Sequence, residues 1–197
     1  MLSRKAFLEP YFEQVAQEEG VQLRTTLEKT ISKFFTISEM VDRIDGLRTK
    51  NLLLHIPYKD YKIQVDYEVG DEQMARFHCD FDNATEMAPF EVRTINPYLR
   101  ILFPRKNMLK VSSSNNQLKK YIEKKLVDTG LENIARKYQF SPSIFGKHHE
   151  GYEVSASFTL SFDRKELVLK PMIQLYKDLI DWVVAMDKNY DSGQQRV

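Results

Sequence analysis

Four histidines and one cysteine are the side chains of this 197-residue sequence best suited to chemistry. His148, His149 and Glu150 are adjacent and precede Gly151, and imidazole and carboxylate groups are common zinc ligands. Adjacent histidines in a strand point to opposite faces, so both can hold one metal ion only from a loop. The triplet leaves two alternatives open: a solvent-exposed turn, or the centre of a metal-dependent hydrolase.

His78, Cys79 and Asp80 also suggest a reactive site, because a nucleophilic cysteine needs a base nearby. The apolar–polar alternation around them places Cys79 on the opposite face from His78, so the two cannot act as a pair. A single cysteine forms no internal disulfide, and we expect a buried thiol in a reducing compartment. His55 stands alone in a predicted strand.

No glycine-rich phosphate loop, nucleophile elbow or zinc-ligand spacing occurs in the sequence. We therefore assign no catalytic, cofactor-binding or metal-binding residue and expect no cofactor. An enzyme is disfavoured rather than excluded, because active sites are assembled in space from residues that need not be adjacent in sequence.

The clearest structural pattern is a β-hairpin over residues 61–82, in which apolar and polar side chains alternate on both arms. A two-residue turn would set apolar residues opposite charged ones, so the loop must contain an odd number of residues. A three-residue loop is one option. A five-residue loop over residues 69–73 pairs Val65 with Phe77 and places opposite charges across the outer face, in the pairs Asp66–Arg76 and Lys62–Asp80. Such pairs contribute roughly 0.2–1 kcal/mol each, so we predict the five-residue loop.

The remaining elements follow the order helices, strands, helices, strands, helix. We predict a helical part over 1–50, a sheet over 51–112, a helix pair over 114–139, a hairpin and a strand over 142–169, a C-terminal helix over 170–188 and a disordered tail over 191–197. Strands joined by tight turns favour an α+β fold with a mostly antiparallel sheet, built on hairpins 61–82 and 142–163 within a single domain, 1–190.

Two details of this assignment depend on short patterns. Residues 114–117 and 129–132 match capping boxes, which predicts that a helix starts after Ser114 and another after Thr129. Residues 21–25 lie inside the predicted helical part, and the alternative for them is a short strand.

The C-terminal helix is apolar over well more than half of its circumference, so it must bury two faces. Leu175, Trp182 and Met186 widen its apolar stripe to one side. The second face either packs on the N-terminal helix, through Phe7 and Tyr11, or forms a surface for a protein partner or a second copy. Trp182 is the kind of residue that dominates interface energies.

Charge is balanced overall but unevenly distributed. The net charge is +1, which excludes a strong global attraction to nucleic acid or membranes. Residues 60–91 hold nine acids and two bases, whereas residues 99–125 hold eight bases and one acid. A candidate anion-binding set follows, consisting of Arg105, Lys106, Lys110, Lys119, Lys120 and Lys124. Few aromatic residues interleave with these bases for stacking on nucleobases.

Our leading hypothesis is a non-catalytic, cytoplasmic protein-binding or assembly module that associates with a protein partner or with itself through Leu175, Trp182 and Met186. The first alternative is weak binding of nucleic acid or a phosphate ligand by the basic segment, and the second is a metal-dependent hydrolase around His148 and His149. We expect no membrane partner, since no apolar run is long enough to cross a bilayer and the N-terminus does not resemble a signal peptide.

Overall fold

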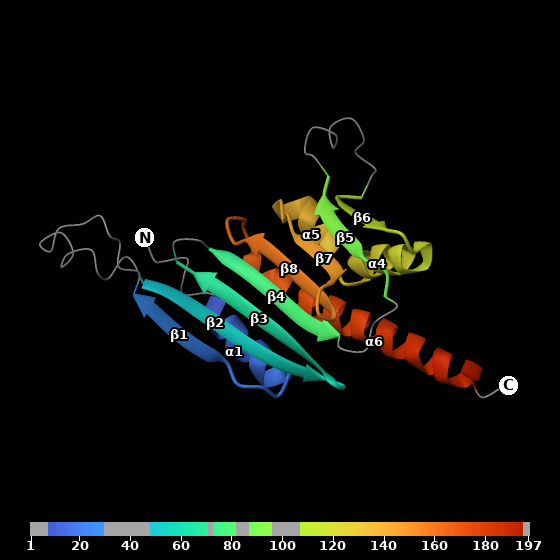
Figure 1. Ribbon diagram of the computed structural model, residues 1–197. Helices are drawn as coiled ribbons and strands as arrows, with labels where there is room; N and C mark the ends of the chain where they lie inside the picture. Colours follow the sequence, from blue (N-terminus) through green and yellow to red (C-terminus); the bar gives the residue numbers. More distant parts are fainter. Residues whose placement is uncertain (1–7, 30–47, 71–72, 82–86, 96–106, 195–197) are drawn as a thin grey trace, which may run out of the picture.

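Alternating apolar and polar residues build one sheet with a single buried face in the computed structural model, which describes residues 8–29, 48–70, 73–81, 87–95 and 107–194 (Figure 1). The strands are β1 (Arg24–Lys29), β2 (Arg48–Tyr58), β3 (Tyr61–Val69), β4 (Met74–Phe81), β5 (Phe90–Thr94), β6 (Leu109–Ser113), β7 (Ser143–His148) and β8 (Tyr152–Thr159). Their spatial order is β1-β2-β3-β4-β8-β7-β5-β6, and every neighbouring pair is antiparallel.

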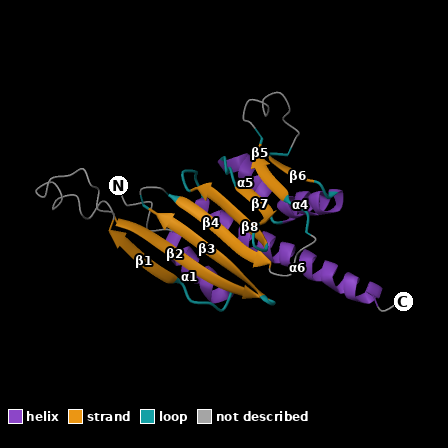
Figure 2. Ribbon diagram, viewed as in Figure 1, coloured by secondary structure: helices purple, strands orange, loops and turns teal. Residues whose placement is uncertain are grey.

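The helices cover only one face of this sheet, as Figure 2 shows. They are α1 (Leu8–Glu18), α4 (Asn116–Asp128), α5 (Leu131–Tyr138), the 3-10 helix η2 (Lys165–Val168) and α6 (Leu169–Gln194). The predicted α+β class with an antiparallel sheet and a long C-terminal helix is confirmed. The opposite, outer face is lined by the polar members of each alternating strand and is uncovered by any described helix.

The register of the β3–β4 hairpin is the one predicted from the five-residue loop. Val65 pairs with Phe77, and Asp66 pairs with Arg76. The Arg76 guanidinium lies 3.7 Å from Asp66 and 3.1 Å from Glu68. The described ladder ends at the Gln64–His78 pair, so the predicted pairing of Lys62 with Asp80 is not part of it.

The predicted helical part over residues 1–50 is wrong where β1 and the first residues of β2 lie, and the alternative short strand at residues 21–25 overlaps β1 only at Arg24 and Thr25. Residues 24–29 form an edge strand antiparallel to β2, in which Thr25 and Thr26 supply the β-branched side chains that strands favour. Local helical spacing was overridden by pairing with β2. Helix α1 begins at Leu8 and accommodates Pro10 in its first turn, as expected for that residue. The helical segments predicted between residues 30 and 47 lie outside the described residues.

The C-terminal half departs from expectation at three boundaries. Strand β7 continues to His148, through residues predicted as a turn. Residues 165–168 form a 3-10 helix where the end of a strand was predicted. Helix α6 continues to Gln194, so residues 191–194 are helical and do not belong to the predicted disordered tail.

Neither predicted capping box forms. Asn115, and not Ser114, caps α4, because its Oδ1 accepts hydrogen bonds from the Gln117 and Leu118 amides at 2.9 and 3.1 Å. At α5 the capping position is Gly130, with a φ of +84° that a side chain would resist. Glu132 turns away from that helix end and binds the backbone of β6.

Two buried tyrosines in the core are expected to respond in opposite ways to loss of their hydroxyls. The Tyr176 hydroxyl donates to the carbonyls of Phe77 and Val154, at 3.1 and 3.4 Å, whereas the Tyr67 hydroxyl has no partner among the described residues. We expect Tyr176→Phe to lower the free energy of unfolding by about 1 kcal/mol, and Tyr67→Phe to leave it unchanged or raise it. Urea denaturation of both variants measures the difference, and a larger loss for Tyr67→Phe would contradict the assignment.

Candidate functional site

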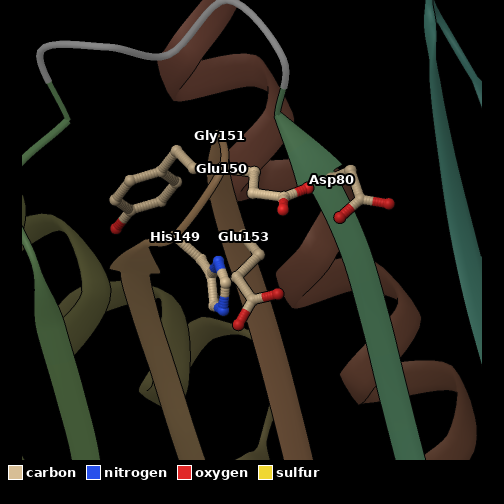
Figure 3. A pocket seen from close by; sticks show the side chains of 6 residues that line it. Asp80, His149, Glu150, Gly151 and Glu153 are labelled. Carbon is tan, nitrogen blue, oxygen red and sulfur yellow. The ribbon is translucent and has the colours of Figure 1, made fainter.

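The end of β4 and the turn between β7 and β8 border an open, solvent-accessible cavity of about 720 Å³. Its lining consists of Asp80, His149, Glu150, Gly151, Tyr152 and Glu153. Figure 3 shows the carboxylates of Asp80, Glu150 and Glu153 and the imidazole of His149 turned toward one hollow. Three acids and a histidine around one opening are suited to binding a cation.

His78 extends this group along the outer face of the sheet. The β4–β8 register places His78 opposite Ser155 and Asp80 opposite Glu153. His78 Nδ1 and Ser155 Oγ share a hydrogen bond of 3.0 Å, and His78 Nε2 and Asp80 Oδ1 share one of 2.8 Å. Ligand atoms of His78, Asp80 and Glu153 all lie within 4.8 Å of one another. We call these three residues the outer-face cluster.

The hydrogen-bond chain from Ser155 through His78 to Asp80 has the residue types of a hydrolytic triad. Acyl transfer also needs donors that stabilise an oxyanion beside the nucleophile. Ser155 lies inside a central strand and pairs with His78 on one side and Phe145 on the other, so the ladder engages the backbone there. The chain of bonds therefore orients His78 but does not by itself form a hydrolase site.

The two adjacent histidines of the sequence diverge. His148 Nε2 and the Met87 carbonyl are 3.0 Å apart, and the His148 ring packs edge-on against Tyr152 at 4.9 Å. His149 lines the cavity. The histidine pair therefore does not converge on one point, and only His149 and Glu150 of that triplet belong to the cavity. Cys79 is buried on the other face of the sheet from His78, in agreement with the sequence.

The three residues proposed as a partner surface occupy different environments on α6. Leu175 is 1% exposed, so it belongs to the core and is removed from the candidate surface. Trp182 is partly buried, with its ring 4.5 Å from that of Tyr121 on α4. Met186 is 38% exposed. Within the described side chains of α6, the second apolar face is therefore covered by α4 at Trp182 and exposed at Met186.

The contact between α4 and α6 is well anchored below Trp182. The Tyr121 hydroxyl donates to the Asp178 carbonyl at 2.8 Å, and Lys125 pairs with the Asp178 carboxylate at 3.0 Å. Burial, with a smaller contribution from Asp178 and Asp181, raises the pKa of Tyr121 to about 12, so this hydroxyl remains a donor at neutral pH. The Trp182 indole N–H is buried and has no acceptor among the described residues.

The four candidate basic residues that the structure describes do not share one surface. Lys110 is exposed between the buried Leu109 and Val111, so it projects from the outer face of β6. Lys119, Lys120 and Lys124 lie on α4, which packs on the covered face. Arg105 and Lys106 lie outside the described residues. The described lysines therefore form no continuous track for a phosphate backbone.

Sequence reasoning missed the outer-face cluster, although it placed His78 and Asp80 on one face. Glu153 enters the cluster, and Ser155 reaches His78, through the pairing of β4 with β8. These two strands are separated in sequence by the whole segment between Phe81 and Tyr152. The alternation of β8 identified its polar face, but no local signal identifies the strand that lies beside it.

No described helix is both long enough and apolar enough to cross a bilayer. Comparison of the chain with protein-family models, with curated proteins and with solved structures finds no match, so the residues themselves carry the functional argument.

Proposed function

We propose that this protein is an assembly module that binds protein through the free end of α6, and that the occupant of this surface is a second copy of the chain. The observation that carries the proposal is the projection of α6 beyond the sheet and its neighbouring helices (Figure 1). Val183 is the last buried side chain described on this helix, whereas the backbone of α6 remains helical to Gln194.

A helical end that extends past the described neighbouring elements suggests a missing neighbour. A helix segment of two or three turns is marginal in water, because helix formation is cooperative and short helices gain little from propensity alone. Lateral packing of an apolar face usually supplies the stabilisation. Met186 offers such a surface, and the partly buried Trp182 lies one turn before it.

A second copy fits this geometry because one surface is then sufficient for both partners. In a two-fold dimer the same patch faces itself, and such isologous pairs are the commonest oligomers of soluble proteins. Two projecting α6 ends packed against each other would cover Met186 and the open side of Trp182 in both chains. The buried Trp182 N–H without an acceptor is consistent with a local rearrangement on association.

Polar contacts hold the base of α6 and so fix the direction in which its end projects. Lys177 pairs with Glu19, directly after α1, at 2.6 Å. On the other side, Asp181 accepts a hydrogen bond from the Tyr58 hydroxyl at 3.1 Å and pairs with Lys59 at the β2–β3 turn. A helix that is fixed at its base loses little conformational entropy on binding, which favours association.

The test compares two exposed apolar residues. Met186→Asp places a charge on the proposed contact, and Val127→Asp places the same charge on α4, where Val127 is 55% exposed. We expect the wild type to dimerise with rising concentration, and Met186→Asp to weaken dimerisation roughly tenfold or more. Sedimentation velocity across a concentration series measures both constants.

Val127→Asp serves as the control and is expected to dimerise like the wild type. Circular dichroism shows whether each variant keeps its secondary structure. A wild type that remains monomeric throughout the series would refute self-association. Equal weakening by both substitutions would show that general charge, and not the α6 end, controls association.

A further inference from the structure

We infer that the outer face of the sheet carries a binding site for a divalent transition-metal ion, with His78, Asp80 and Glu153 as ligands. The inference is independent of the assembly proposed for α6, because it rests on a different face of the molecule. It starts from the outer-face cluster, in which an imidazole nitrogen and two carboxylates lie within 4.8 Å of one another.

The backbone brings these ligands together without help from a flexible loop. His78 and Asp80 are two residues apart on β4, so both point to the outer face, and Glu153 lies directly opposite Asp80 on β8. Metal–ligand bonds of about 2.1 Å in a tetrahedron require ligand atoms about 3.4 Å apart. Small side-chain rotations are sufficient to reach that separation, because all three side chains are partly exposed.

The charge arrangement also favours a cation. Like charges directly opposite each other across an antiparallel ladder are destabilising, and Asp80 and Glu153 form such a pair. Lys147 Nζ lies 3.1 Å from Glu153, and His78 Nε2 lies 2.8 Å from Asp80, so each carboxylate has a separate partner. A metal ion between the two carboxylates would compensate both charges at one point.

Ser155 fixes His78 in the orientation that a ligand needs. Metal-binding histidines usually donate their other ring N–H to an oxygen acceptor, which fixes the tautomer and the ring. His78 Nδ1 is 3.0 Å from Ser155 Oγ. In its hydrogen bond with the Asp80 carboxylate, Nε2 is the donor. A metal ion would take the place of that proton, and Nδ1–H would then donate to Ser155 Oγ while the Nε2 lone pair binds the metal.

The donor set identifies the class of ion. Carboxylates alone suit magnesium and calcium, whereas an imidazole ligand shifts preference toward zinc and other first-row divalent metals. Asp80 and Glu153 also line the cavity, so ions reach the cluster from solvent. His149 lines the same hollow but lies outside the group of three ligands.

The first experiment is isothermal titration of the full-length, metal-free protein with zinc chloride. We expect one zinc ion per chain, and a loss of affinity of roughly 100-fold or more in His78→Asn and Glu153→Gln, since each removes a direct ligand. The matched control is His55→Asn, because His55 is a partly buried histidine on β2 that also faces outward.

Two further substitutions are expected to act in opposite directions. Ser155→Ala leaves the ligands in place but frees the His78 ring, so zinc affinity should fall roughly tenfold. Lys147→Ala removes the ammonium that competes for Glu153, so zinc affinity should rise. General damage to the surface would not produce opposite signs.

Absence of stoichiometric zinc binding by the wild type would overturn the inference. It would also be overturned if His55→Asn weakened binding as much as His78→Asn, because zinc would then bind surface histidines in general. Circular dichroism of each variant without zinc separates loss of a ligand from loss of the fold. If Glu153→Gln does not fold, Asp80→Asn, at the more exposed ligand, replaces it in the same titration.

Discussion

Replacing Gly146 by alanine is expected to lower the free energy of unfolding by about 3 kcal/mol. A Cβ atom at this position would lie 2.1 Å from the Tyr152 hydroxyl oxygen and 2.4 Å from the Phe90 ring. Both neighbours are buried, and the Tyr152 hydroxyl donates to the Ala88 carbonyl at 3.1 Å. Relief of the clash would therefore break that hydrogen bond or separate β7 from β5. Urea denaturation followed by circular dichroism measures the change.

Gly151→Ala is the matched control for this substitution. A Cβ at Gly151 meets no atom within 4 Å, so we expect a change within about 0.5 kcal/mol. Gly146 lies inside β7, where the Phe90 ring approaches the backbone, whereas Gly151 lies in the turn that follows β7. If both alanine variants were equally stable, the close approach of Phe90 and Tyr152 to the backbone of β7 would be wrong.

The hairpin of β3 and β4 was predictable because any shift of its register by one residue would expose its apolar side chains. A slip of one residue would move Val65 and Phe77 to the polar face, and the choice among odd loops followed from the charges of Asp66 and Arg76. The structure has that register. Local pairing with a strong amphipathic pattern is the part of a fold that a single sequence specifies most directly.

The neighbour of β8 was not predictable in the same way. Its outer face is mostly serine and threonine, which match many partners equally well and so carry little information about register. The pairing of β4 with β8 joins segments far apart in sequence, and the outer-face cluster exists only because of that pairing. A site whose ligands come from two distant strands leaves no spacing pattern in the sequence.

The start of α5 at Leu131 shows how the residues of a local sequence motif can make contacts other than the predicted ones. The capping-box pattern correctly located a new helix near Thr129, but its two side chains do not cap that helix. Thr129 Oγ1 donates back to the Lys125 carbonyl at 2.7 Å, and the Glu132 carboxylate bonds to β6. The Glu132 carboxylate therefore accepts hydrogen bonds from the backbone at the start of β6, and not from the amides at the start of its own helix.

Replacing Glu132 by alanine is accordingly expected to cost about 3 kcal/mol of unfolding free energy. Its carboxylate accepts hydrogen bonds from the backbone amides of Met108 and Leu109, the latter at 3.0 Å, and the residue is 8% exposed. A buried donor that loses its partner costs about 1–3 kcal/mol, and this substitution leaves two such donors. Glu132→Gln, which can accept from only one of them well, should cost roughly half as much.

The comparison with Thr129→Ala decides between the two roles of Glu132. In a capping box, the two side chains would contribute similarly, at about 1 kcal/mol each. In the structure, the Thr129 hydroxyl donates a hydrogen bond at the end of α4. The free energy of unfolding lost in Thr129→Ala should therefore be several-fold smaller than that lost in Glu132→Ala. Asn133→Ala, an exposed position on α5, corrects for helix propensity. Urea unfolding of the three variants gives the ratio of the two losses in free energy of unfolding. Equal losses for Thr129→Ala and Glu132→Ala would support the capping box and contradict the hydrogen bonds between Glu132 and β6.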